Sequence, residues 1–167
     1  MGLVVVAKAI ASLLILFELL FALLVFAGVL SVDVAVGISM QPFIETGAVL
    51  ITMNPDYYEK YINDNFTNKM VEYIAFGDMV WINNLTGERV TVHFKVPTPI
   101  AHLCTLDKGD YLIVHGLNND EWYEIVPREN VLGVVILVLD IRLALALAVL
   151  IGLFTATAIF YGFYRRV

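Results

Sequence analysis

The side chains best suited to covalent or acid–base chemistry are one serine near the N-terminal apolar segment and the three histidines of the chain. Ser39 follows that segment closely, in the string Ser39-Met40-Gln41-Pro42. A serine hydroxyl becomes a good nucleophile only when a base removes its proton, and an imidazole can accept that proton near neutral pH. Ser39 is therefore a candidate nucleophile in need of a histidine.

The three histidines differ in their surroundings. His93 alternates with strand-type neighbours in Val92-His93-Phe94, which favours a surface or packing role. His102 follows Pro97 and Pro99, and prolines are confined to strand edges or bends. A bend bounded by prolines can present a side chain to a cleft, which makes His102 a candidate base.

Several other kinds of site are disfavoured. Cys104 is the only cysteine, so no intrachain disulfide or cysteine metal cluster can form. Because nothing near it would activate a thiolate, we expect a core residue. No pair of histidines has helical metal-ligand spacing, so neither a metal nor another cofactor is expected. The net charge of −6 argues against nucleic acid as a partner.

The elements that must position Ser39 begin with two apolar ends. Hydrophobic residues make up 60% of the chain and gather at 4–32 and 141–163, and each stretch is long enough for a transmembrane helix. The first is too long for the apolar region of a cleaved signal peptide. Glu18 lies in its middle, where an ionised carboxylate is costly, so we expect it to be protonated or bonded to a neighbouring helix.

The charged and aromatic residues that flank these segments predict their orientation. Tyr161 and Tyr164 precede Arg165 and Arg166 at the C-terminal end, and Lys8 lies near the start of the chain. Cationic residues favour the cytoplasmic side of a membrane. The sequence therefore predicts a multi-pass protein of the cell membrane, with both termini cytoplasmic and the middle part extracytoplasmic.

The middle part, residues 33–139, is predicted to be one small, mainly β domain. Short runs rich in Val, Ile, Tyr and Trp, separated by turn residues, predict strands at 49–53, 79–82, 89–96, 111–115 and 131–139. Apolar and aromatic spacing predicts one helix at 56–71.

Five short strings occur in order through this domain. They are Ser39-Met40-Gln41-Pro42, Gly77-Asp78-Met79-Val80, Ile100-Ala101-His102-Leu103, His115-Gly116-Leu117-Asn118-Asn119 and Asn130-Val131-Leu132-Gly133. Together they resemble the type I signal peptidases of the archaeal and endoplasmic-reticulum branch, over roughly residues 33–139. This resemblance implies a small extracytoplasmic β domain held by a membrane anchor, and an endopeptidase that cleaves signal peptides from exported preproteins.

The resemblance also implies roles for individual residues. Ser39 would be the nucleophile, with Met40 and Pro42 shaping the loop that meets the substrate, and His102 would be the general base. The acid that orients the histidine would lie in or just after the box at Gly116, where Asp120 is preferred to Glu121. His115 takes the lysine position of that box and is expected to be structural. Signal peptides and membrane lipid are the implied partners, and further membrane subunits or a translocon remain open.

Two alternatives stay open beside this assignment. Leu103 stands where the family has arginine, and Leu117 and Ala48 stand where it has aspartates. These departures motivate a second hypothesis, a catalytically inactive, membrane-anchored peptide-binding or accessory protein.

A serine–lysine dyad is the other alternative, and it would need a buried lysine with a lowered pKa. Lys95 is the candidate, but the glycine-rich signature of that branch does not follow it.

Overall fold

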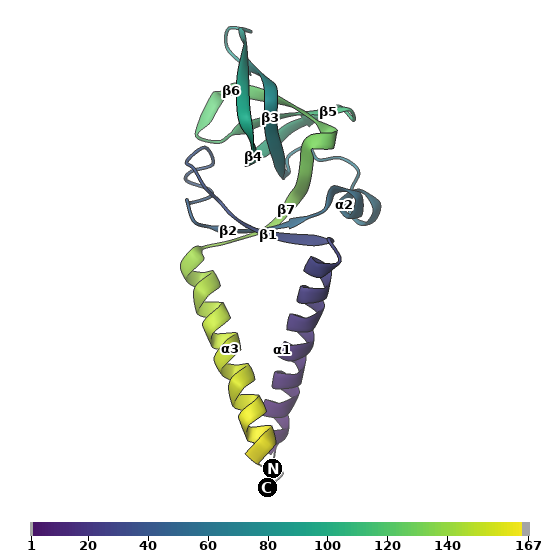
Figure 1. Ribbon diagram of the computed structural model, residues 1–167, viewed down its shortest axis with the longest axis vertical. Coiled ribbons are helices and arrows are strands. Elements are labelled where there is room, and N and C mark those ends of the chain that lie inside the picture. The colour runs from purple at the N-terminus through teal and green to yellow at the C-terminus, as the bar shows by residue number, and fades with distance from the viewer. Residues whose placement is uncertain (1, 165–167) are drawn as a thin grey trace.

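The protein has a β domain mounted on two long helices (Figure 1). The computed structural model describes residues 2–164, and it describes their side chains except those of residues 2–4, 7, 8, 120, 158, 159 and 161–164. Helices α1 (Gly2–Phe26) and α3 (Ile141–Tyr164) meet near the chain termini and spread apart toward the domain (Figure 1). Thr155 of α3 donates a hydrogen bond of 3.3 Å to Glu18 of α1, so the two helices share a polar contact.

Helix α1 contains a stretch, Ala9–Phe26, that is long and apolar enough to cross a membrane. The predicted segment 4–32 was too long at its C-terminal end, because the helix stops at Phe26 and Gly28 turns the chain at φ +69°. A left-handed glycine ends many helices in this way. Strand β1 (Leu30–Val34) follows at once and includes the polar residues Ser31 and Asp33.

Helix α3 is apolar over Ile141–Thr157, a shorter stretch than that of α1. Among the described residues, α1 is thus the one helix with the length and composition of a membrane span. Asp140 caps the start of α3 by accepting hydrogen bonds from the backbone amides of Arg142 and Leu143. The side chains on which the predicted orientation depends (Lys8, Tyr161, Tyr164, Arg165 and Arg166) lie outside the described ones.

The domain is mainly β, as predicted. Its remaining elements are β2 (Val49–Met53), α2 (Pro55–Tyr61), β3 (Met70–Asn83), β4 (Arg89–Asp107), β5 (Tyr111–Gly116), β6 (Asn119–Pro127), the 3-10 helix η1 (Arg128–Asn130) and β7 (Val131–Leu139). Every predicted strand falls within one of these strands, whereas β1 and β6 were not predicted.

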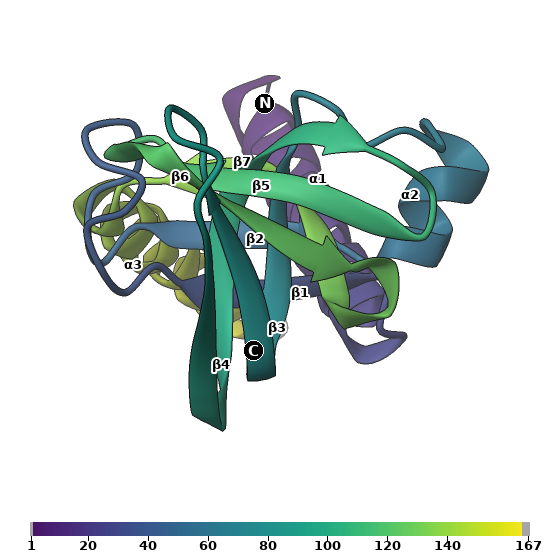
Figure 2. The ribbon, with the colours of Figure 1, turned by 90° about the horizontal axis from the view of Figure 1, so that it is seen from above.

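The strands pair antiparallel in the order β1-β2-β7-β3-β4-β5-β6. A further pairing of β3 with β6 closes the last four strands into a barrel. Seen from above, β4, β5 and β6 lie over β1 and β2, which lie over the helices (Figure 2). The layer of β1, β2 and β7 therefore separates the barrel from the two helices.

The predicted helix at 56–71 was wrong beyond Tyr61. Asn63 accepts a hydrogen bond from the amide of Asn65, and Asn65 accepts one from the amide of Thr67. Such side-chain bonds compete with helical backbone bonds, and Asn68 adopts a positive φ of 62°. The chain consequently turns out of the helix and enters β3 at Met70.

Two apolar clusters stabilise the domain. The larger one fills the barrel and includes Phe66, Tyr73, Leu112, Val114 and Val126, which are all fully buried. The smaller one lies under the loop between β1 and β2 and comprises Met40, Ile44, Ala48 and Leu50. The second cluster thus fixes the segment that carries Ser39 onto the sheet.

A polar chain lies buried between the two layers. Glu72 of β3 is 5% exposed and accepts a hydrogen bond of 3.3 Å from Thr52 of β2, which also contacts Ser31 of β1. Burial and, next, the charge of Asp33 raise the pKa of Glu72 to about 7, although the bond from Thr52 opposes the shift. An ionised Glu72 therefore weakens the contact between β1, β2 and β3.

This raised pKa predicts a pH-dependent stability. The contribution of Glu72 is fully present below its ordinary pKa of 4.5 and is lost as the pH rises through about 7. We expect the unfolding free energy of the native chain to fall relative to Glu72→Gln by roughly 1–3 kcal/mol over that interval. Thermal unfolding in detergent between pH 5 and pH 8 measures this difference. The exposed Glu88→Gln serves as control, and parallel curves for Glu72→Gln and the native chain would contradict the prediction.

Candidate active site

Ser39 lies in a closed loop between β1 and β2. Backbone bonds join Ala35 to Ala48 and Gly47 at the base of this loop, each with an N···O distance of 2.8 Å. Thr46 donates its hydroxyl proton to the carbonyl oxygen of Gly37 at 2.6 Å. With Met40 buried beneath it, the loop is packed at its base and at its centre, so Ser39 has a fixed position.

His102 of β4 lies directly beside Ser39. Its Nε2 atom is 3.0 Å from the Oγ atom of Ser39, and its side chain is almost completely buried, with 5% exposure. The strand portion that carries it pairs with β3 through Val71, and it also contains Pro97 and Pro99. The two residues chosen from the sequence are thus within hydrogen-bond distance of each other.

The opposite ring nitrogen of His102 meets two side chains that the sequence did not reveal. Nδ1 is 3.1 Å from Oε1 of Glu124 and 3.1 Å from the hydroxyl of Tyr73. Tyr73 in turn donates its hydroxyl proton to Oε2 of Glu124. Glu124 comes from β6 and Tyr73 from β3, so the barrel brings both residues to His102.

The position of the orienting acid differs from the one expected. The carboxylate in contact with His102 is that of Glu124, whereas Glu121 is exposed and the side chain of Asp120 lies outside the described ones. The alternation of β6 contains the signal, because Glu124 and Val126 share its buried face. That alternation was not used, because no strand was predicted at residues 119–127.

These contacts define the hydrogen-bonding state of the imidazole. Burial and the charge of Glu124 both raise the pKa of Tyr73, so its hydroxyl keeps its proton and acts as a donor to Glu124. A carboxylate accepts hydrogen bonds only, so the Nδ1 atom facing it carries the proton. The Nε2 atom then presents a lone pair to Ser39, as a general base requires.

The turn between β5 and β6 holds the Ser39 loop against the barrel. The amide of Asn118 donates to the carbonyl oxygen of Ser39 at 2.8 Å, and its side-chain Nδ2 atom donates to the carbonyl oxygen of Ile38 at 3.2 Å. At Gly116 a Cβ atom would lie 2.8 Å from the Ser39 carbonyl oxygen and 3.1 Å from Nε2 of His102. The absence of a side chain there permits the contact between serine and histidine.

The three departures from the signal-peptidase pattern lie in one place. Ala48 belongs to the apolar cluster under the Ser39 loop, and Leu103 and Leu117 pack against that cluster with Met40. The three positions that depart from the pattern therefore share one apolar cluster.

The remaining candidate residues lie apart from this arrangement. His93 is exposed and pairs with Asp78 at 2.6 Å, and His115 packs against Tyr123 with 5.0 Å between ring centroids. Lys95 is exposed, which removes the burial that a serine–lysine dyad needs. Cys104 is fully buried in the barrel core, where burial and the charge of Asp107 raise its pKa to about 11.

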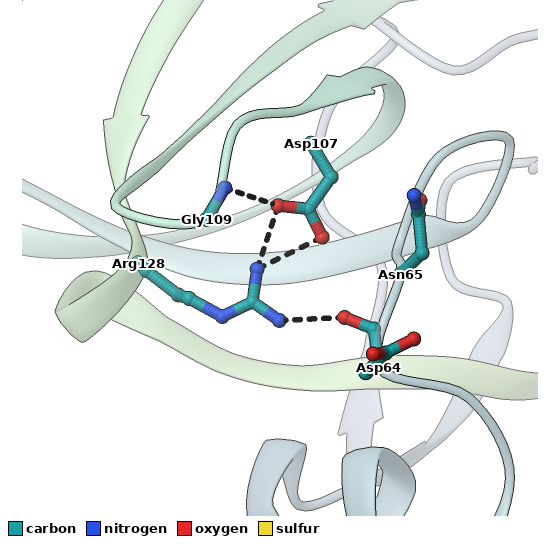
Figure 3. Close-up of a pocket in the computed structure, with 5 residues that line it drawn as sticks. All are labelled: Asp64, Asn65, Asp107, Gly109 and Arg128. Carbon is teal, nitrogen blue, oxygen red and sulfur yellow. Dashed lines mark hydrogen bonds and ion pairs between the residues drawn. The ribbon is translucent and has the colours of Figure 1, made fainter.

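A shallow pocket elsewhere on the domain is structural in character. It is lined by Asp64, Asn65, Asp107, Gly109 and Arg128 (Figure 3). Arg128 donates to both carboxylate oxygens of Asp107 at 2.7 and 2.8 Å, to the backbone oxygen of Asp64 at 3.0 Å and to Glu59 at 2.8 Å. These bonds occupy the guanidinium and tie α2 to the β4–β5 turn. Among the described residues, no group of three His, Cys, Asp or Glu side chains could hold a metal ion.

The close approach at Gly116 gives a test of the site. We expect Gly116→Ala to displace Ser39 from His102 and to slow labelling of Ser39 by a fluorophosphonate, a reagent for activated serines, by about 10²-fold. Mass spectrometry of the labelled peptide measures the rate, and an unchanged unfolding temperature shows that the fold persists. Gly152→Ala, which meets no atom within 4 Å, is the control. Equal labelling of both variants would contradict the arrangement described above.

Comparison with known proteins adds no relative. No family model, no curated protein and no solved structure matches the chain. Its function must therefore be inferred from its own residues, above all from the contacts of Ser39, His102 and Glu124.

Proposed function

We propose that this chain is a membrane-bound serine endopeptidase that removes signal peptides from exported preproteins. The observation that carries the proposal is the hydrogen bond of 3.0 Å between Ser39 Oγ and His102 Nε2. It is supported by the carboxylate of Glu124 at the other ring nitrogen. Serine hydrolases on unrelated folds use the same arrangement, in which a nucleophile contacts a base and the base contacts an orienting acid.

The proposed reaction needs only the side chains of this site and water. His102 takes the proton of Ser39 while the serine oxygen attacks the scissile carbonyl carbon. The imidazolium, stabilised by Glu124, then gives that proton to the departing amine, which leaves an acyl-enzyme. Water attacks the acyl group with His102 again as base, and this step releases the second product and restores Ser39.

The position of the nucleophile supports a substrate that leaves a membrane. Ser39 is separated from the apolar stretch Ala9–Phe26 by a short turn, β1 and a few loop residues. In the proposed enzyme, α1 and α3 both cross the cell membrane with cytoplasmic termini, and the β domain is extracytoplasmic. The bond from Thr155 to Glu18 supports a paired arrangement of these helices. A signal peptide would then meet Ser39 where it emerges from the bilayer.

The contacts of the three residues that depart from the signal-peptidase pattern favour an enzyme over an accessory protein. Leu103, Leu117 and Ala48 contribute to an apolar cluster that supports the Ser39 loop. Glu124 supplies the carboxylate that an aspartate in the box at Gly116 would otherwise supply. Burying a histidine next to a carboxylate is costly unless both are hydrogen-bonded, and this chain maintains that arrangement next to a serine.

Cleavage of a preprotein tests the proposal. The full chain, reconstituted in liposomes, is expected to cut a preprotein with an Ala-x-Ala site after the second alanine. Ser39→Ala and His102→Ala should each reduce the rate by about 10³-fold or more, as in other serine hydrolases. His93→Ala, at an exposed imidazole, is the matched control and should retain activity. A native chain that binds the preprotein but leaves it uncut would favour the accessory protein.

The identity of the orienting acid gives a separate prediction. We expect Glu124→Gln to lower the cleavage rate by about 10²- to 10⁴-fold, because an amide no longer fixes the tautomer of His102. Asp120→Asn and Glu121→Gln, measured in the same assay, should retain most of the activity. A larger loss in Asp120→Asn than in Glu124→Gln would return the role to Asp120.

A further inference from the structure

We propose that Tyr73 is a positioning residue that holds Glu124 in the state needed to keep His102 a base toward Ser39. The inference rests on the proposed function only in its use of Ser39 as a nucleophile. It assigns a fourth side chain to the site, one whose hydroxyl bonds to Glu124 and His102. Tyr73 would act through Glu124 and His102.

The site of this interaction is closed to water. Tyr73 is 0% exposed, Glu124 3% and His102 5%, and they come from three different strands of the barrel, β3, β6 and β4. Across the sheet, Glu124 pairs with Val114 of β5 and Trp81 of β3, neither of which carries an ionisable group. Among the described side chains, Glu124 has its hydrogen-bond and ion-pair contacts with the hydroxyl of Tyr73 and the imidazole of His102.

A buried carboxylate needs hydrogen-bond donors to both of its oxygens. His102 serves Oε1 at 3.1 Å, and Tyr73 serves Oε2. The Tyr73 hydroxyl has a single proton, which it donates to Glu124, so its oxygen can only accept from the Nδ1 proton 3.1 Å away. Both acceptors around Nδ1 thus favour the tautomer with the proton at that atom, and this leaves Nε2 free to accept the proton of Ser39.

Removal of the hydroxyl would weaken this assignment. In Tyr73→Phe, Oε2 of Glu124 loses its donor and Nδ1 of His102 loses one of its two acceptors. The carboxylate is then held less firmly beside Nδ1, and a larger share of the neutral imidazole carries its proton at Nε2. An Nε2 atom that carries a proton cannot take another from Ser39, so the serine becomes less reactive.

The test uses labelling of Ser39 by a fluorophosphonate in the full chain at pH 7. We expect Tyr73→Phe to react roughly 10- to 100-fold more slowly than the native chain, the scale for loss of one buried hydrogen bond to a charged group. Tyr123→Phe is the control, because this tyrosine packs against His115 and not against the site.

A double variant separates positioning from packing. If Tyr73 acts through Glu124, then Tyr73→Phe combined with Glu124→Gln should label as slowly as Glu124→Gln alone, within about twofold. Effects that multiply, or labelling of Tyr73→Phe at the native rate, would overturn the proposal. Each variant is compared with the native chain in its unfolding temperature, so that loss of fold is recognised.

A measurement on the native chain keeps the proposal testable if Tyr73→Phe does not fold. The ¹⁵N resonances of histidine report which ring nitrogen carries the proton, and in the neutral imidazole of His102 that nitrogen should be Nδ1. A proton at Nε2 would overturn the inference. Failure to cleave preproteins, with Nδ1 protonated and labelling dependent on Tyr73, would refute the peptidase alone.

Discussion

The hydrogen bond between Ser39 and His102 joins two parts of the fold that no local preference brings together. Ser39 belongs to a loop of the β1–β2–β7 layer, and His102 belongs to the barrel. Their contact requires the β5–β6 turn, where Asn118 binds the backbone of Ser39 and where a Cβ on Gly116 would collide with both residues. A separation of these two layers by one ångström would break the hydrogen bond of 3.0 Å between Ser39 and His102.

Closure of the barrel brings the acid to the histidine. Because β3 pairs with β6 as well as with β4, Tyr73, His102 and Glu124 face a common interior. A carboxylate on a strand is positioned by the register of the sheet, whereas one in a turn depends on the turn itself. In this chain, the box at Gly116 has an apolar Leu117, which packs toward Met40, and the carboxylate lies on β6 instead.

Runs rich in Val, Ile, Tyr and Trp were enough to predict strands such as β2 and β7. β1 was not predicted, because residues 4–32 were assigned to one apolar segment, and the turn at Gly28 and the pairing with β2 separate the strand from the helix. The motif around Ser39 and the box that contains His102 pointed to the two side chains that lie 3.0 Å apart. Glu124 could not be predicted, because its contact with His102 depends on the pairing of β3 with β6. β6 itself was not recognised as a strand, because polar residues follow Asn118.

The two helices join the layer that carries the nucleophile, and this arrangement bears on how the proposed enzyme would meet its substrate. α1 leads into β1 through a turn at Gly28, and β7 leads into α3 through the cap at Asp140. β2 pairs with both β1 and β7, so the Ser39 loop begins and ends on strands that are tied directly to the helices. The height of Ser39 above a membrane would then be set by backbone hydrogen bonds. His102 and Glu124 belong to the barrel. The barrel is held beside the Ser39 loop by the pairing of β3 with β7 and by the bonds from Asn118.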